Sequence, residues 1–129
     1  MTNYNYKPIL DNFSGEELRN LAAEKAKYIT IRKYYDVNGN EAPDGTSEDV
    51  KRLATKREKE IITNLIHGAL LAIRWRNDSA QVAMDTAEFT ASLFIDGING
   101  YISVYSPIWY ILETLRERVE TGYRSPVLH

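Results

Sequence analysis

The stretch IITNLIHGALLAIRW, residues 61–75, decides the fold. Wound at 3.6 residues per turn, it is apolar over most of its circumference, which is typical of a buried helix. Thr63, Asn64, His67 and Gly68 interrupt the run, so it is too short and too polar to span a bilayer. The sequence therefore predicts a mainly α fold built around this segment, and no membrane partner.

The apolar face of this segment continues toward the N-terminus through Leu53 and Val50. A helix that begins at Thr46 or Ser47, with acidic residues next to its positive end, is therefore predicted. Such a helix has about 30 residues and is about 45 Å long, whereas a compact chain of this length has a diameter of about 35 Å. The helix is thus expected either to kink near Gly68 or to project from the domain toward a partner.

Three further helices are predicted from start and stop signals. Each start combines a capping side chain with a favourable neighbour, and the stops are polar turns or glycine. The predicted helices run from Ser14, in a capping box with Glu17, to about Tyr35; from Asp78, with Gln81, to about Phe94; and from Ser106-Pro107 to Gly122.

The remaining segments complete a four-helix bundle-like single domain over residues 1–129. Asn99-Gly100 lies between β-branched and aromatic residues and predicts a short β-hairpin at about 95–105. Residues 1–12, which include Pro8, and residues 123–129 lack a helical period and are expected to form extended arms at the two ends.

Composition narrows the class of protein. The chain is 43% hydrophobic and 26% charged, with a net charge of −2 and no cysteine, which argues against disorder and excludes disulfides and thiolate chemistry. The first ten residues lack the apolar core of a secretory signal peptide. A cytoplasmic or virion location, without secretion through a signal peptide, is therefore expected.

One loop resembles the start of an EF-hand or dockerin-type calcium loop, because oxygen-bearing side chains alternate between two predicted helices. The resemblance fails at Glu41, where the loop needs glycine, and at Ser47, where it needs a bidentate acid. A plain turn uses the same residue types. The sequence therefore predicts no metal site or cofactor, and the candidate ligands are Asp36, Asn38, Asn40 and Asp44.

The chain carries no catalytic motif. His67 has no acid or second histidine three or four residues away, and is expected to be a satisfied core or interface residue rather than a metal ligand or a base. The basic run of residues 51–59 is interleaved with acids and lacks stacking aromatics, which argues against nucleic acid. The sequence therefore predicts a protein that is not an enzyme.

Nine tyrosines against three phenylalanines are typical of surfaces that are buried on one side and wet on the other. With the long helix and the arms, they predict a structural subunit that contacts its own copies and neighbouring assembly proteins, by analogy with bacteriophage head–tail connector or neck-ring proteins. The alternative is a small binding or inhibitor module of regulatory, anti-defence or immunity type. The interface candidates are Tyr4, Tyr6, Tyr34, Tyr35, Tyr101, Tyr105, Trp109 and Tyr123.

Overall fold

The computed structural model describes residues 4–42, 44–76, 79–94 and 101–122. Within them the chain is mainly helical, with a small antiparallel sheet, so the predicted helical class is confirmed but the plain four-helix bundle is not. The elements in chain order are α1 Lys7–Leu10, α2 Gly15–Lys25, β1 Tyr28–Tyr35, β2 Thr46–Leu53, α3 Lys56–Trp75, α4 Ala80–Phe94, β3 Tyr101–Ser103 and α5 Tyr105–Glu120.

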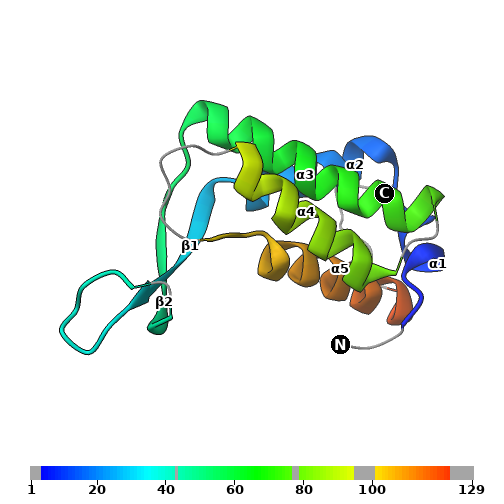
Figure 1. Cartoon of the computed structure of the whole chain (residues 1–129). Coiled ribbons are helices and arrows are strands. Elements are labelled where there is room, and N and C mark those ends of the chain that lie inside the picture. Colours follow the sequence, from blue (N-terminus) through cyan, green and yellow to red (C-terminus); the bar gives the residue numbers. More distant parts are fainter. Residues whose placement is uncertain (1–3, 43, 77–78, 95–100, 123–129) are drawn as a thin grey trace.

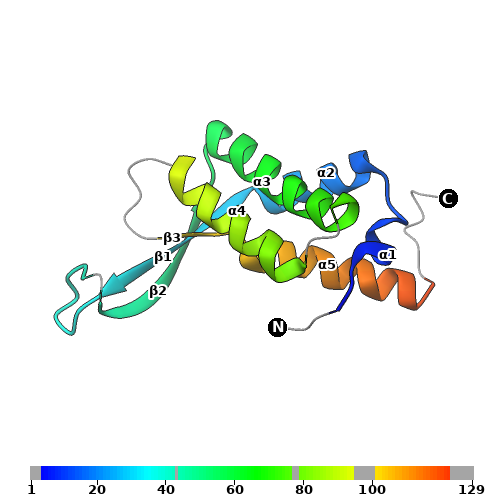
Figure 2. The same ribbon diagram turned by 45° about the vertical axis from the view of Figure 1, so that its right-hand side comes forward.

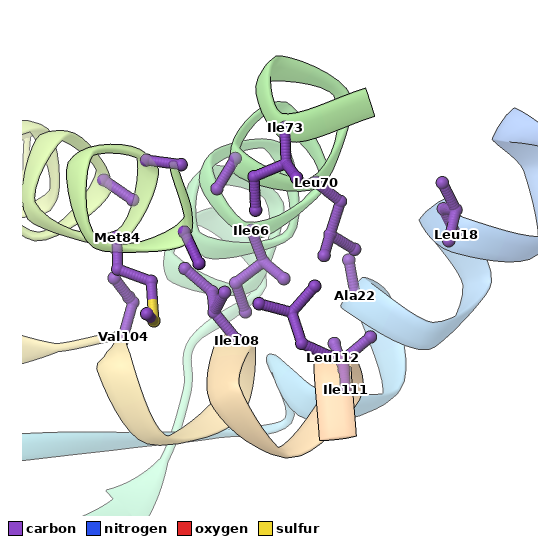
Figure 3. Packing of buried hydrophobic residues seen from close by; sticks show 14 of the residues in the cluster. Leu18, Ala22, Ile66, Leu70, Ile73, Met84, Val104, Ile108, Ile111 and Leu112 are labelled. Carbon is purple, nitrogen blue, oxygen red and sulfur yellow. The ribbon is translucent and has the colours of Figure 1, made fainter. Parts of the chain in front are cut away.

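Helix α3 is the central element of the core, as predicted from its apolar pattern. It packs against α1, α2, α4 and α5, and its side chains Ile66 and Leu70 have no exposed surface. Figure 3 shows these two side chains among Met84 of α4 and Ile108 and Leu112 of α5. The buried stripe of α5 is the one that its helical spacing predicts.

The prediction of a 30-residue helix that begins near Thr46 is wrong. Helix α3 begins at Lys56, where Thr55 and Glu58 form a reciprocal capping box, and it runs without interruption through Gly68 to Trp75. Its 20 residues correspond to about 30 Å, which fits inside a domain of this size. The predicted overhang and the alternative of a break at Gly68 are therefore both removed.

The first predicted helix is right at its start and wrong at its end. Ser14 and Glu17 form the expected capping box, but α2 ends at Lys25. The chain then enters β1, where Ile29 and Ile31 are buried and their neighbours are not. This two-residue alternation is that of a strand, and it outweighed the looser helical spacing.

The three strands are ordered β2-β1-β3, with both pairs antiparallel. Strand β3, in the second half of the hairpin predicted at about 95–105, pairs with β1, Ile31 lying opposite Ile102. The first half of that hairpin, residues 95–100, lies outside the described residues. Helix α4 does extend to Phe94, as expected.

The N-terminal segment of the chain is not the extended arm that the sequence predicts. Residues 7–10 form helix α1, and Tyr6, Ile9 and Leu10 are buried. These apolar side chains join the predicted arm to the core, where α1 packs against α3 and α5. The predicted C-terminal arm, residues 123–129, lies outside the described part of the chain. Gly122, at φ +73°, follows α5 as the expected glycine stop.

The starts of α4 and α5 also differ from the predictions. At α4 the oxygen of Ser79 accepts a hydrogen bond from the amide of Val82 at 3.2 Å; the predicted cap, Asp78, lies outside the described residues. Helix α5 begins at Tyr105, one residue before the predicted Ser106 cap. The Glu88 carboxylate of α4 caps this end instead. Its Oε1 accepts hydrogen bonds from the amides of Val104, the residue before the helix, and of Tyr105, each at 3.2 Å.

Candidate interaction surfaces

A two-stranded ribbon of β1 and β2 extends away from the helices (Figures 1 and 2). Gly45 lets the hairpin close, because a Cβ atom there would collide with the backbone carbonyl of Tyr35. Beyond the buried Ile31, the two strands are joined across the ladder by the Arg32–Asp49 ion pair at 3.0 Å. Every residue of β2 is exposed, so this strand offers its whole outer edge to solvent.

An ion pair joins strand β2 of the ribbon to the helical body. The Arg52 guanidinium of β2 makes two hydrogen bonds of 2.8 Å to the Glu58 carboxylate of α3, while Glu58 also accepts from the amide of Thr55 at 2.9 Å. The hydrogen bonds from Arg52, helped by those from Thr55, outweigh burial and lower the pKa of Glu58 to about 2. The carboxylate is therefore charged at every physiological pH.

A pocket of about 450 Å³ lies where β1 and β2 meet α2 and the start of α5. Lys25, Lys27 and Lys51 line it, and Lys25 Nζ lies 3.7 Å from the centre of the Tyr110 ring. Among the described residues that line it, Glu24 is the one acid. The local charge is thus positive although the chain is acidic overall, and the pocket suits an anionic group.

A second exposed surface runs along the outer side of α4. Ser79, Val82, Thr86, Phe89 and Leu93 are all exposed, and they follow one another at spacings of three and four residues. That is the spacing of a coiled-coil seam, which packs against another helix. The three apolar members, Val82, Phe89 and Leu93, keep 54%, 67% and 61% of their surface exposed. This stripe therefore faces outward, while the opposite side of α4 is buried.

Three of the predicted interface aromatics, Tyr4, Tyr6 and Trp109, pack against one another within the chain. Tyr6 is 1% exposed, and its hydroxyl donates to Glu113 of α5 at 3.1 Å. Burial, followed by that hydrogen bond, raises the pKa of Tyr6 above its ordinary value. Tyr4 and Trp109 pack edge-on against the Tyr6 ring, so this cluster pins the N-terminal segment to α5.

The other predicted aromatics are scattered. Tyr34 and Tyr35 are half-buried on the ribbon and Tyr105 is half-buried at the start of α5, while burial raises the pKa of Tyr105. The backbone of Tyr101 lies in β3, and Tyr123 lies outside the described residues. Of the predicted aromatics, the structure brings Tyr4, Tyr6 and Trp109 together.

The exposed aromatic side chains are largely ones that the sequence reasoning did not select: Tyr28, Trp75, Phe89 and Tyr110 are each more than half exposed. Tyr28 has a sequence signal, because it alternates with the buried Ile29 and Ile31 and so belongs to the outer face of a strand. Phe89 also has one, through its seam spacing on α4. Neither pattern depends on tyrosine content.

The predicted calcium loop joins two strands, not two helices. Asp36 Oδ1 accepts hydrogen bonds from the amides of Asn38 and Asn40 at 2.9 and 3.0 Å, and Gly39 takes φ +82°, which is the chemistry of a tight turn. Asp36, Asn38, Asn40 and Asp44 are all exposed. No group of three His, Cys, Asp or Glu side chains suited to a metal ion occurs among the described residues.

His67 has a structural partner, as expected. Its Nε2–H donates to the carbonyl of Gly15, at 3.1 Å, and so ties α3 to the start of α2. Burial lowers the pKa of His67, and the nearby charge of Arg19 acts in the same direction. The imidazole is therefore neutral near pH 7 and joins two helices.

Comparison of the chain with protein-family models, with curated proteins and with solved structures returned no match. In the part of the chain that the structure describes, no helix is both long and apolar enough to cross a membrane. The ribbon, the pocket at its base and the outer stripe of α4 are the surfaces of the described chain that could hold a partner.

Proposed function

We propose that this protein is a non-enzymatic structural subunit of a homo-oligomeric assembly and acts through protein–protein contacts. The observation that carries the proposal is the β1–β2 ribbon, which leaves the helical body and presents an eight-residue edge strand with every residue exposed. A long open edge is a template for pairing with another chain. Such a ribbon could contact a neighbouring subunit by pairing its open edge with a strand of that subunit.

The outer stripe of α4 supports an assembly larger than a dimer. A surface that pairs with itself about a two-fold axis closes after two copies, so further growth needs a second, different surface. The stripe of Val82, Phe89 and Leu93 lies on another element and has the spacing of a helix–helix seam. One contact through strands and one through helices would link copies into a ring or lattice.

Within this class, we favour a bacteriophage virion component of head–tail connector or neck-ring type. The support is an analogy of architecture: a small helical body that carries a β-hairpin arm for its neighbours. The predicted overhanging helix no longer contributes, because residues 46–53 form β2 and α3 begins at Lys56, and the N-terminal arm no longer contributes, because Tyr6, Ile9 and Leu10 are buried in the body. The ribbon takes over the bridging role that the sequence assigned to them.

The test is the size of the particle in solution, measured by native mass spectrometry and sedimentation at several concentrations. An assembly of more than two copies supports the proposal, and a monomer at the highest soluble concentration overturns it. Val82→Lys and Leu93→Lys place a charge in the α4 seam and should reduce the particle to a dimer. Lys56→Glu, at an exposed position of α3, is the matched surface control and should leave the size unchanged.

The pocket at the base of the ribbon favours a second candidate function, that of a small module that binds an acidic ligand or partner. Three lysines and one glutamate line it beside Tyr28 and Tyr110. Titration with an acidic peptide, followed by the amide NMR signals of Lys25, Lys27 and Lys51, tests this role. Shifts confined to these residues and abolished in Lys27→Glu support it, whereas salt-dependent shifts over the whole surface contradict it.

A further inference from the structure

The outward-pointing backbone groups of β2 can be assigned from one hydrogen bond. Just after the strand, the amide of Ala54 donates to the carbonyl of Lys27 at 2.9 Å, in register with the β1–β2 ladder. Hydrogen-bonded pairs alternate along an antiparallel ladder, so Arg52, Val50 and Glu48 bond to β1. The amides and carbonyls of the intervening residues, Ser47, Asp49, Lys51 and Leu53, then point away from the sheet.

These outward groups limit how a second strand could pair with β2. An antiparallel partner must place outward residues opposite outward residues, and only a few registers of β2 with itself satisfy this. Centred on Asp49 or on Lys51, the register would place like charges directly opposite each other, which is destabilising. Centred on Val50, it places Asp49 opposite Lys51 of the second copy, and Glu48 opposite Arg52.

We propose that β2 pairs with β2 of a second copy of this chain, antiparallel about a two-fold axis at Val50, so that the two sheets join into one. The inference rests on the proposed function, because it names the surface and the partner of the assembly contact. Each copy contributes both members of each charge pair, so the two-fold axis doubles every favourable contact. The sequence EDVKR, residues 48–52, is thus complementary to itself when reversed.

The side chains involved retain capacity for these contacts. Arg32 Nε binds Asp49 at Oδ1, which leaves Oδ2 to accept from Lys51 of the second copy. The hydrogen bonds of Arg52 to Glu58 and to the carbonyl of Leu53 use its terminal nitrogens, which leaves its Nε–H for Glu48. Val50, at the axis, is 37% exposed and would be covered by its own symmetry mate.

The charges also select against other partners. Lysine and acidic side chains on an edge strand discourage pairing with a neutral or unmatched strand, since an unmatched charge loses water without gaining a partner. In β2 the acids precede the bases with a valine between them. This order places opposite charges together when the partner is an antiparallel copy of β2. The edge therefore disfavours pairing with other strands and still allows pairing with β2 of a second copy.

The experiment is a charge-swap test on the full chain. Lys51→Glu places acids opposite Asp49 at both ends of the two-fold contact, and Asp49→Lys places lysines opposite Lys51. Each variant alone should dimerise at least roughly ten-fold more weakly than wild type, or about 1.4 kcal/mol. An equimolar mixture of the two should dimerise again, because both cross-strand pairs then have opposite charges. Lys56→Glu serves as the control, and circular dichroism checks that each variant folds.

Amide exchange on the wild type gives a second, independent readout. Dimerisation should slow the exchange of the Asp49 and Lys51 amides as concentration rises, while the exposed distal turn at Asn38 and Gly39 should not change. An assembly that persists in both charge variants, or a mixture that behaves like the single variants, overturns the β2 contact and leaves the assembly function standing. A wild-type monomer at all concentrations overturns both. A dimer lost in the variants and regained in the mixture, with no larger particle, supports the β2 contact and contradicts the larger assembly.

Discussion

Replacing Glu58 by glutamine tests how the ribbon is fastened to the helical body. The carboxylate receives both terminal nitrogens of Arg52 and the amide of Thr55. Glutamine can keep the capping bond to Thr55, because its side-chain oxygen also accepts, but it loses the charge that attracts Arg52. The substitution therefore removes the ion pair while sparing the helix cap.

The magnitude follows from the pKa of Glu58, which the Arg52 hydrogen bonds lower from 4.5 to about 2. A difference of about 2.5 pKa units corresponds to at most about 3.4 kcal/mol. Since the Arg52 side chain is 41% exposed, solvent screens the pair and we expect roughly 1–2 kcal/mol. Because the folded-state pKa is the lower one, this stability is present above about pH 4.5 and is lost as the pH falls toward 2.

The assay is urea unfolding of the wild type and of Glu58→Gln at a series of pH values between 7 and 2. Glu60→Gln, the same chemical change at an exposed position of the same helix, is the matched control. We expect the variant to be less stable than the control at pH 7, and the gap to close as the pH falls toward 2. Equal stability of the two variants at pH 7, or a gap that does not depend on pH, would refute the role assigned to the Arg52–Glu58 pair.

Three further predictions concern the turn, the start of α5 and the histidine. Gly45→Ala should destabilise the chain by about 1–3 kcal/mol in urea unfolding, because its methyl group collides with the Tyr35 carbonyl; an unchanged midpoint contradicts this. Glu88→Ala should cost about 2 kcal/mol and Glu88→Gln less, since only the latter keeps an acceptor for the amides at the start of α5; equal losses would contradict capping. His67 should titrate below 6.5 by NMR, so its contribution to stability is full above that pH and declines as the pH falls; a pKa above 6.5 would contradict its burial as a neutral ring.

The parts of the fold that the sequence predicted are those with a buried face. Helices α3, α4 and α5 carry apolar side chains at helical spacing, and the structure buries those side chains. The Ser14–Glu17 capping box was also predictable, because it depends only on two residues that lie three positions apart in the sequence. The box of Thr55 and Glu58 was equally visible in the sequence, and it would have placed the start of α3 correctly.

Strand β2 could not be predicted in the same way, because none of its residues is buried. A hydrophobic pattern records only the side chains that a fold covers, and β2 is held by its ladder to β1 and by Arg52. Its acidic start resembled a helix N-terminus. Tyrosine content also does not predict exposure: Tyr6, which it selected as an interface candidate, is buried, whereas Tyr28, which it did not select, is exposed.

The stability of the ribbon links the fold to the proposed assembly. Burial supports β1 at Ile29 and Ile31, and β3 pairs with it only as far as Arg32. Beyond that point the two strands are held by their own ladder and by contacts with the segment that connects them, such as the Lys33–Glu41 ion pair. An isolated two-stranded hairpin is marginal in water. A third strand relieves this, and β2 of a second copy supplies one on the open edge. The part of the ribbon beside the contact, residues 47–53 with the β1 residues opposite them, is therefore expected to gain order when copies associate. Its folding and the assembly are then coupled.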